Sequence, residues 1–372
     1  MKPDAPLSLR IILLGLALGC GFVSAPARAQ NAYVPNAGSG TVSVISTATN
    51  TVSSTVTLGG APNSAAVTPD GSKAYVANLN GSVSVISTAT NTVTATIPIA
   101  GSQLFNLAVT PDSRTVYVTD DSSNNAVWAI ATATNTVMQM ISLTATAGLN
   151  AQPDGVTIAP NGSTVYVADF EANAVSVIDT ATNTVTATIP VGNGPTGIAV
   201  SPDGSTLYVA NIGENTGSNA NTVSVIATAT NTVTSYLPGF NLPNAVAVSP
   251  DGSTLYVTND TVSNGTVSVL ATAGDTLSAT IPVGSEPSGA GLTRDGSTLY
   301  VPNVGSADVS VIDTATNIVT ATVTVGSNPG SLGAFVQSPP PPPAPSLGPW
   351  AAALFAVFLA GVGIALARRR DA

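Results

Sequence analysis

The sequence contains no histidine and a single cysteine, Cys20. Without histidine there can be no Ser-His triad and no histidine metal ligand, and the commonest general base is missing. Cys20 lies near the N-terminus, so the rest of the chain has no thiol with which to form an internal disulfide. Its stability therefore has to come from packing and hydrogen bonding.

Positive charge is equally scarce. Residues 30–338 hold three cations, Lys73, Arg114 and Arg294, against 17 acids, which gives that span a net charge of −14. A nucleic-acid-binding surface needs the opposite sign, so this class of partner is excluded. What the chain does have is Thr, Ser, Val, Ala, Gly and Asn in abundance, with 5% aromatic and 8% charged residues. Such a composition favours an all-β fold with many turns.

The first 29 residues are typical of an export signal. Lys2 and Arg10 precede the apolar run "IILLGLALG", and Ala27 and Ala29 form a cleavage site before Gln30. The run is too short to span a bilayer. The alternative is a lipoprotein signal that uses Cys20, although Ala17 stands where such signals usually have leucine.

The C-terminal end combines a spacer with a membrane-type segment. Residues 338–346, "SPPPPPAPS", predict a stiff polyproline linker. After it comes a tail, residues 347–372, in which Trp350 and an apolar run to Ala367 are followed by Arg368, Arg369 and Arg370. This order predicts a membrane span over residues 350–367 whose arginines stay on the cytoplasmic side.

The tail resembles the IPTL-type sorting signals of Gram-negative bacteria. Pro345, Leu347, Trp350 and the arginines match that pattern, whereas Ala344, Ser346 and Ala351 replace its usual Ile, Thr and Gly. The resemblance implies an exosortase-like protease as a partner, and display in the periplasm or at the cell surface. A plain single-span anchor in the inner membrane remains the alternative.

Between the two ends, one phrase recurs around a tyrosine-valine pair. The tyrosines are spaced 42, 42, 49, 42, 48 and 44 residues apart: Tyr33, Tyr75, Tyr117, Tyr166, Tyr208, Tyr256 and Tyr300. Seven units of this length predict a seven-bladed β-propeller of four-stranded blades over residues 30–337, because each sheet buries its faces only against its neighbours. In the phrase at 184–191, we expect Val185, Ala187, Ile189 and Val191 to share one face of the outermost strand.

The motifs "YVTN" at 256–259, "YVAN" at 75–78 and "YVPN" at 33–36 make residues 31–336 similar to the YVTN-repeat propeller family. The resemblance implies the propeller fold, with surface-layer and secreted proteins among the members. Residues 330–336 read as an innermost strand without a successor, and residues 31–36 as a second strand without a predecessor. We expect these two segments to pair in one blade and close the ring.

Loop length varies on one side of the predicted ring only. In each blade the turn between the first and second strands and the turn between the third and fourth keep their lengths, whereas the other two connections vary, and binding usually lies where loops vary. The candidate ligand-binding residues are the acids and phenylalanines of those variable connections: Asp120, Asp121, Asp169, Glu171, Glu214, Asp260, Asp308, Phe105, Phe170 and Phe240. Alternatively, these acids only keep loops soluble and the phenylalanines only fill gaps between blades.

The sequence predicts an exported binding or scaffold module that is not an enzyme. Calcium is a plausible ligand, with Asp169 and Glu214 as candidates, because carboxylates and loop carbonyls are its natural ligands. The alternative is a lactonase-like or other hydrolytic propeller, in which a carboxylate pair such as Asp120 with Asp121, or Asp169 with Glu171, would do the chemistry. No catalytic residue can be named from the spacing.

Overall fold

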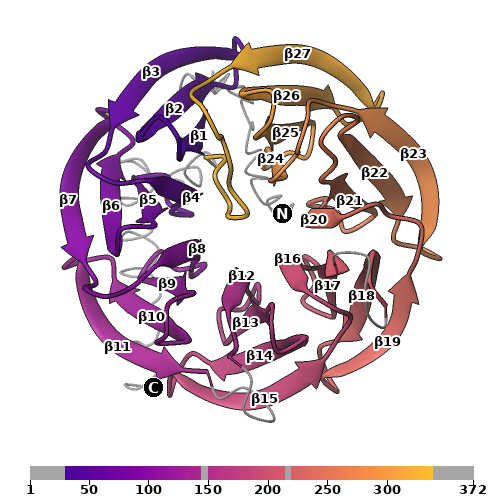
Figure 1. The fold of residues 1–372 in the computed structure, drawn as a ribbon, viewed down its shortest axis with the longest axis horizontal. Coiled ribbons are helices and arrows are strands. Elements are labelled where there is room, and N and C mark those ends of the chain that lie inside the picture. Colours follow the sequence, from indigo (N-terminus) through magenta and orange to yellow (C-terminus); the bar gives the residue numbers. More distant parts are fainter. Residues whose placement is uncertain (1–29, 144–149, 214–218, 338–372) are drawn as a thin grey trace, which may run out of the picture.

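The computed structural model describes residues 30–143, 150–213 and 219–337, which form seven β-sheets around a central axis (Figure 1). Six sheets have four strands, and the first has three regular strands, β1 to β3. The fold is therefore the seven-bladed propeller that the repeat predicts. The segments predicted to be the export signal, the linker and the sorting tail lie outside the described residues. Among the residues that the structure does describe, no helix is long and apolar enough to cross a membrane.

Each blade has its strands in the order A to D from the axis outward, and blade 1 begins at β1, a B strand (Figure 1). The A strands are β4 (Pro62–Val67), β8 (Leu104–Val109), β12 (Pro153–Ile158), β16 (Pro195–Val200), β20 (Pro243–Val248) and β24 (Gly291–Leu292). The B strands are β1 (Asn31–Asn36), β5 (Lys73–Asn78), β9 (Thr115–Asp120), β13 (Thr164–Asp169), β17 (Thr206–Asn211), β21 (Thr254–Asn259) and β25 (Thr298–Asn303).

The two outer strands of each blade complete the sheet. The C strands are β2 (Thr41–Ser46), β6 (Ser82–Ser87), β10 (Ala126–Ala131), β14 (Ala174–Asp179), β18 (Thr222–Ala227), β22 (Thr266–Ala271) and β26 (Asp308–Asp313). The D strands are β3 (Thr51–Thr57), β7 (Thr92–Pro98), β11 (Thr136–Ser142), β15 (Thr184–Pro190), β19 (Thr232–Leu237), β23 (Thr276–Pro282) and β27 (Ile318–Thr324).

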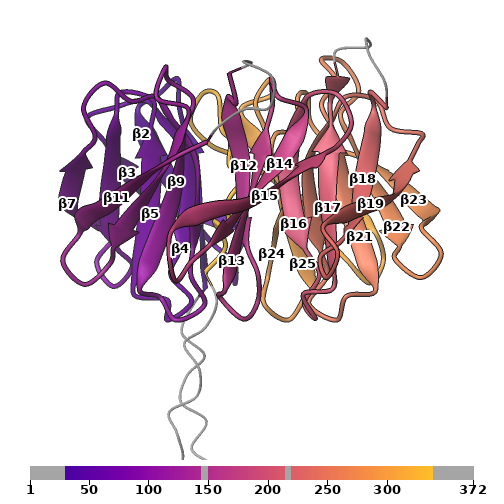
Figure 2. The ribbon, with the colours of Figure 1, turned by 90° about the horizontal axis from the view of Figure 1, so that it is seen from below.

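The connections gather on two opposite faces of the ring (Figure 2). On one, the turn face, every A–B turn that joins two regular strands has five residues and every C–D turn has four. On the other, the variable face, the B–C loops run from three residues (79–81) to ten (212–221), and the D–A connection 143–152 also has ten. The expectation that loop variation lies on one face is confirmed.

The core is divided into layers between neighbouring blades. In the layer between blades 3 and 4, for example, Val127 and Ile141 of one sheet pack with Val156 and Val167 of the next. No blade could bury these residues alone, which is the physical reason that the phrase is repeated.

On the turn face, a part-buried hydrogen bond from the strand B tyrosine links each of blades 1 to 3 to the next blade. The Tyr33 hydroxyl donates to Oδ1 of Asn91 at 2.7 Å, and the Tyr117 hydroxyl donates to Oδ1 of Asn183 at the same distance. Both asparagines end a C–D turn with positive φ, 53° and 52°, a conformation that asparagine tolerates better than most residues. The "TATNT" turn thus supplies both the bend and the acceptor.

The outermost strand departs from strict alternation. In β15, Ala187 pairs with Val177 and Val185 pairs with Ile178, so Thr186 is an extra residue in a β-bulge. As a result Ala187, Ile189 and Val191 pack toward blade 5, whereas Val185 packs toward blade 3. The expectation that all four share one face is wrong for Val185, because a bulge shifts the phase of the alternation.

The ring closes as the sequence predicts, though through a less regular strand. Residues 329–337, which we call the closing segment, run beside β1 and form bridges from Pro329 to Asn36 and from Val336 to Ala32. Backbone hydrogen bonds include Tyr33 N–H to the Phe335 carbonyl at 2.9 Å. Between its two ends the segment loops toward the axis, where Figure 1 shows it in yellow near the centre of the ring.

Candidate functional site

Seven residues, one from the innermost strand or segment of each blade, surround the mouth of the axis on the variable face. In blades 2 to 6 the residue that opens strand A lies opposite the last residue of strand B, as Pro153 lies opposite Asp169. Pro287, which precedes β24, and Pro329 of the closing segment take this position in blades 7 and 1. Where strand A is regular at this point, the register shifts just after that pair, and such bulges re-aim the side chain that follows. The residues that follow form the axial ring: Asn63, Phe105, Asp154, Thr196, Asn244, Ser288 and Gly330.

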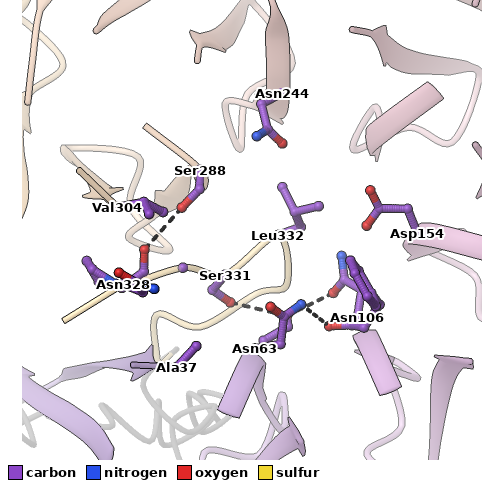
Figure 3. A pocket seen from close by; sticks show the side chains of 14 residues that line it. Ala37, Asn63, Asn106, Asp154, Asn244, Ser288, Val304, Asn328, Ser331 and Leu332 are labelled. Atoms are coloured by element: carbon purple, nitrogen blue, oxygen red, sulfur yellow. Dashed lines mark hydrogen bonds between the residues drawn. The ribbon is translucent and has the colours of Figure 1, made fainter. Parts of the chain in front are cut away.

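Six members of the axial ring line a pocket of about 300 Å³, together with residues of the closing segment. Figure 3 shows Asp154 and Asn244 on one side of it, with Asn63 and Ser331 across from them. Asn63 donates to the Phe105 carbonyl at 2.8 Å, and Ser288 donates to the Pro329 carbonyl at 3.2 Å. Each of these bonds joins one blade to the next, so the pocket wall is built by the closed ring.

Asn106 provides a buried donor without an acceptor at this pocket. It is 1% exposed, and its Oδ1 accepts hydrogen bonds from Ser64 Oγ at 2.9 Å and from the Leu107 N–H at 2.7 Å. Its Nδ2 has no acceptor among the described residues. An unpaired buried donor costs about 1–3 kcal/mol, which a bound acceptor would recover.

Asp154 brings a carboxylate to the same pocket (Figure 3). Burial, together with the smaller effect of the Asp121 charge, raises its pKa to about 7. No described residue donates a hydrogen bond to this carboxylate, whereas its backbone carbonyl accepts one from Thr119 Oγ1 at 2.9 Å. The main chain is thus fixed, and the acidic group is left for a ligand.

The closing segment divides the axial channel in two. Leu332 lines the polar pocket on the variable face, and it also lines a second cavity of about 360 Å³ toward the turn face. That second cavity is walled mainly by the aliphatic residues of the A strands, among them Val109, Ile158 and Val200. The charged group, Asp154, and most of the amide and hydroxyl side chains therefore lie in the half on the variable face.

Asp120, predicted as a ligand residue, is engaged inside the protein. Its side chain is fully buried, and it accepts hydrogen bonds from Ser102, Asn124 and Trp128 at 2.7 to 2.9 Å. Burial raises the pKa of this carboxyl, but the hydrogen bonds outweigh burial and hold it below its usual value. Asp120 therefore stays charged and acts as a structural acceptor.

Asp169 occupies the position that is asparagine in five other blades. Asn36, for instance, donates through Nδ2 to Thr41 Oγ1 at 3.1 Å and to Ser43 Oγ at 3.0 Å, which ties strand B to strand C. Asp169 accepts one hydrogen bond, from Ser176 at 2.6 Å, and is 2% exposed. Burial raises its pKa to about 7, although the Ser176 hydrogen bonds oppose this shift.

Asp121 and Glu171 lie near one another at the variable face, between blades 3 and 4. Burial, together with the smaller effects of the Asp120 and Glu171 charges, raises the pKa of Asp121 to about 6. Its Oδ1 is buried without a described partner. The charge of Asp121 also raises the pKa of Asp154. Acidic side chains therefore extend from Glu171 and Asp121 on the variable face to Asp154 in the axial pocket.

The other predicted acids lie further round the ring. Asp260 accepts a hydrogen bond of 2.9 Å from Asn244 and so orients a member of the axial ring. Burial raises the pKa of Asp260. Asp308 accepts a hydrogen bond of 2.7 Å from Asn303 within its own blade. Glu214 lies outside the described residues.

The three predicted phenylalanines have different environments. Phe105 belongs to the axial ring and lines the pocket. Phe240 packs on the core layer between blades 5 and 6, which contains Tyr208 and Leu237. Phe170 packs over Gly194, where an added Cβ would lie 3.2 Å from its ring. Thus one of the three is a wall of the pocket, and two fill gaps between blades.

Calcium has no ready-made acidic cage in the described part of the chain, because no three of its Asp or Glu side chains converge well enough to hold a metal ion. The expectation of a calcium site at Asp169 and Glu214 stays a prediction. Sequence reasoning also missed most of the axial ring, since it compared loop lengths. Aligning the residue after each strand-opening Pro or Leu would have shown one position that is polar in most repeats.

Comparison with known proteins gives a fold and a partial family match. A family model described as the SMP-30/Gluconolactonase/LRE-like region matches residues 105–213, which run from blade 3 into blade 5. No curated protein is similar enough in sequence to count as a match.

Solved structures of the same architecture are numerous. Hydrazine synthase of Kuenenia stuttgartiensis is 24% identical with a TM-score of 0.65, over 73% of this chain and 88% of that one. A functionally unknown protein of Desulfotomaculum acetoxidans is 20% identical with a TM-score of 0.66, over 81% and 99%. A candidate 6-phosphogluconolactonase of Bacteroides uniformis is 16% identical with a TM-score of 0.67, over 83% and 99%. These likenesses show the fold.

Proposed function

We propose that this protein is an exported, surface-displayed binding module whose ligand site is the axial pocket on the variable face. The observation that carries the proposal is the pairing of Asn106 Nδ2, a buried donor without an acceptor, with Asp154, a carboxylate without a donor, at one pocket. A ligand that both accepts and donates hydrogen bonds satisfies both groups at once.

Charge narrows the ligand class. All three cations of residues 30–338 lie in or beside A–B turns on the turn face, so the variable face carries acids without compensating cations among its described residues. Phosphorylated and carboxylated ligands would be repelled there. A small hydroxylated molecule, or one with an ammonium group, fits both the sign of the field and the polar wall. Calcium, expected from the composition, is the simplest positive occupant.

Presentation of this face follows from the predicted tail. The closing segment ends on the turn face, where the Gln337 N–H donates to the Asn31 carbonyl at 2.8 Å. A tail that leaves from this point and enters the inner membrane, or is processed there by an exosortase-like protease, would hold the variable face away from the membrane. Mass spectrometry of surface material tests processing: a C-terminal peptide that ends before residue 350 supports it, and intact Arg370 contradicts it.

The binding test uses the full chain and two panels of small molecules, polyols and amines in one and their phosphorylated counterparts in the other. Calorimetry should show binding from the first panel only. Asp154→Asn should abolish it, whereas Asp203→Asn, an exposed acid of an A–B turn, should leave it unchanged. Binding that survives Asp154→Asn would place the ligand elsewhere.

A hydrolytic function is the second candidate, favoured by the match of residues 105–213 to the SMP-30/gluconolactonase region and by the raised pKa of Asp154. A carboxylate with a pKa near 7 suits a general base that activates water. Hydrolysis of neutral lactones, lost in Asp154→Asn and rising with pH through about 7, would establish it. Binding of such lactones without hydrolysis would support the non-enzymatic binding module instead.

A further inference from the structure

Blade 3 breaks the pattern of the repeat at three positions that lie close together. The first is the third residue of strand C, which is tryptophan in this blade, Trp128. In the other six blades it is serine: Ser43, Ser84, Ser176, Ser224, Ser268 and Ser310. These serines bond to the residue that ends strand B, as Ser43 does with Asn36.

The second position is the extra residue of the strand D bulge, which is Met138. In the other six blades this residue is Ser or Thr, and its hydroxyl donates to a carbonyl of strand C at 2.9 to 3.2 Å: Ser53, Thr94, Thr186, Thr234, Ser278 and Thr320. A thioether cannot donate, so blade 3 gives up this bond. The third position is Met140, where five of the other blades have threonine.

Pairing places two of the three side chains on one face of the sheet. Met140 lies directly opposite Trp128 in the β10–β11 ladder, and Met138, the unpaired residue of the bulge, is two residues earlier in β11. Side chains of directly opposed residues leave the sheet on the same face, with Cβ atoms about 4.5–5.5 Å apart. Met138 and Met140 are 51% and 44% exposed, so both side chains are open to solvent.

The indole is held in place by a charged acceptor. Trp128 Nε1–H donates to Asp120 Oδ2 at 2.9 Å. Because further hydrogen bonds lower the pKa of Asp120, its carboxylate remains negative at neutral pH. This holds the indole in place on the residue opposite Met140 and adds an attractive field for a cation.

Packing alone does not account for the two methionines. More than half of the Met138 side chain stays in solvent, so it gains little burial in return for the missing hydroxyl-to-carbonyl bond. At Met138 the sequence breaks a local rule that every other blade keeps, without a gain in packing, and such a departure points to function.

We propose that Met138, Met140 and Trp128 form a binding site for a soft monovalent cation, Cu(I) or its analogue Ag(I). Thioether sulfur is a soft ligand that selects Cu(I) over the hard ions Mg²⁺ and Ca²⁺. The face of the indole attracts a cation that lies over it. Zn²⁺ is disfavoured because its usual thiolate and imidazole ligands are absent from this part of the chain. The site lies on the rim of blade 3 and is independent of the axial pocket.

Ag(I), which is stable in air, is the first probe, and Cu(I) under anaerobic conditions with a chromogenic competitor is the second. Every protein carries Cys20→Ser in the full chain, because a thiolate would bind either ion more tightly than a thioether. We expect one ion per chain and a loss of tryptophan emission that saturates at that ratio. The emission change should vanish in Trp128→Phe, which leaves Trp350 as the baseline.

Met138→Leu and Met140→Leu preserve size and exposure while removing sulfur, and each should lower the affinity for Ag(I) by about tenfold or more. Ile318→Leu, an exposed apolar residue on strand D of blade 7, is the matched control and should change nothing. Unchanged affinity in both methionine variants, or equal quenching by Ca²⁺ or Zn²⁺, would overturn the proposal. Melting curves of each variant establish that a loss of binding is not a loss of fold.

Discussion

The Tyr300 hydroxyl donates a hydrogen bond of 2.8 Å to Oδ1 of Asn50, a residue 250 positions earlier in the chain. It joins blade 7 to blade 1 with the geometry that joins Tyr33 to Asn91 in the adjoining pair of blades. The seam between the last and first blades therefore has the same bond as the junctions between blades 1 and 2, 2 and 3, and 3 and 4. At the equivalent turn position of blades 5 and 7, Oδ1 of Asn231 and of Asn317 has no partner among the described residues. Neither partner is exchangeable, because the tyrosine is fully buried and the asparagine also has to adopt a positive φ of 52°.

Removing this bond should loosen the seam. We expect Tyr300→Phe to lower the free energy of unfolding by about 1–3 kcal/mol, because the ring is kept while the buried acceptor of Asn50 loses its donor. Chemical denaturation measures the change. Tyr236→Phe, on the outer strand of blade 5, is the control and should have a smaller effect. Equal losses in the free energy of unfolding would show that the hydrogen bond between Tyr300 and Asn50 does not itself stabilise the seam.

Alkaline pH should unfold the protein through its buried tyrosines. Burial raises the pKa of Tyr33, Tyr75, Tyr117 and Tyr300 from 10.0 to about 12. A folded-state pKa above the unfolded one stabilises the protein fully below pH 10, and that contribution is lost as the pH rises through 12. Melting temperatures followed from pH 8 to pH 12 should be level at first and then fall. A fall that begins well below pH 10 would point to other groups.

Replacing Asp169 with asparagine should stabilise the protein. The new Nδ2 can donate to Ser176, as Asn36 does to Ser43, and a buried carboxylate is removed. Since burial raises the Asp169 pKa from 3.8 to about 7, the wild type loses stability as the pH rises through that interval, and the variant should lose less. We expect a gain of about 1 kcal/mol at pH 8 that shrinks toward pH 4. Destabilisation at pH 8 would indicate that the charge itself is required.

Calcium can be tested on the axial pocket directly. Excess calcium should raise the melting temperature of the full chain above pH 7, where Asp154 is ionised, and the increase should be lost in Asp154→Asn. Asp203→Ala on the turn face should retain it. An unchanged melting temperature in the wild type would remove calcium from the ligands of this pocket.

Closure can be tested on Gly333 of the closing segment. An added Cβ there would lie 2.6 Å from the Ala65 carbonyl oxygen, so Gly333→Ala should cost about 1–3 kcal/mol by overpacking. Deleting residues 330–336 should go further and abolish cooperative unfolding, since β1 would lose its inner partner. Gly59→Ala, a glycine with open space around it and without a positive φ, is the control for a loss of chain freedom. Unchanged melting after the deletion would refute closure by this segment.

The repeat spacing predicted the fold because tyrosine, turn asparagine and strand alternation act within a few residues of one another. Seven blades, the pairing of residues 330–336 with β1 and the single variable face all followed from it. The phase shift at Val185 did not, because a bulge depends on which backbone groups pair across two strands rather than on side-chain pattern.

The site was harder to predict than the fold. Asp120 and Asp169 look like loop acids in the sequence, but each is the last residue of a B strand and points into its blade. The sequence does not indicate a functional role for Asp154, because a single acid after a proline belongs to no recognisable motif. Asp154 lines a pocket only because residues from other blades meet it at the variable-face end of the axis.

The hydrogen bond between Gln337 and Asn31 gives the chain a further property. Because β1 and the closing segment are antiparallel neighbours in one blade, the propeller is in effect a circle that is cut at one point. A short linker across that point would close the circle, and any four-residue C–D turn could then serve as the new opening. The order of the blades around the ring could thus be kept while the chain starts at a different blade, and each blade could be the first in the sequence.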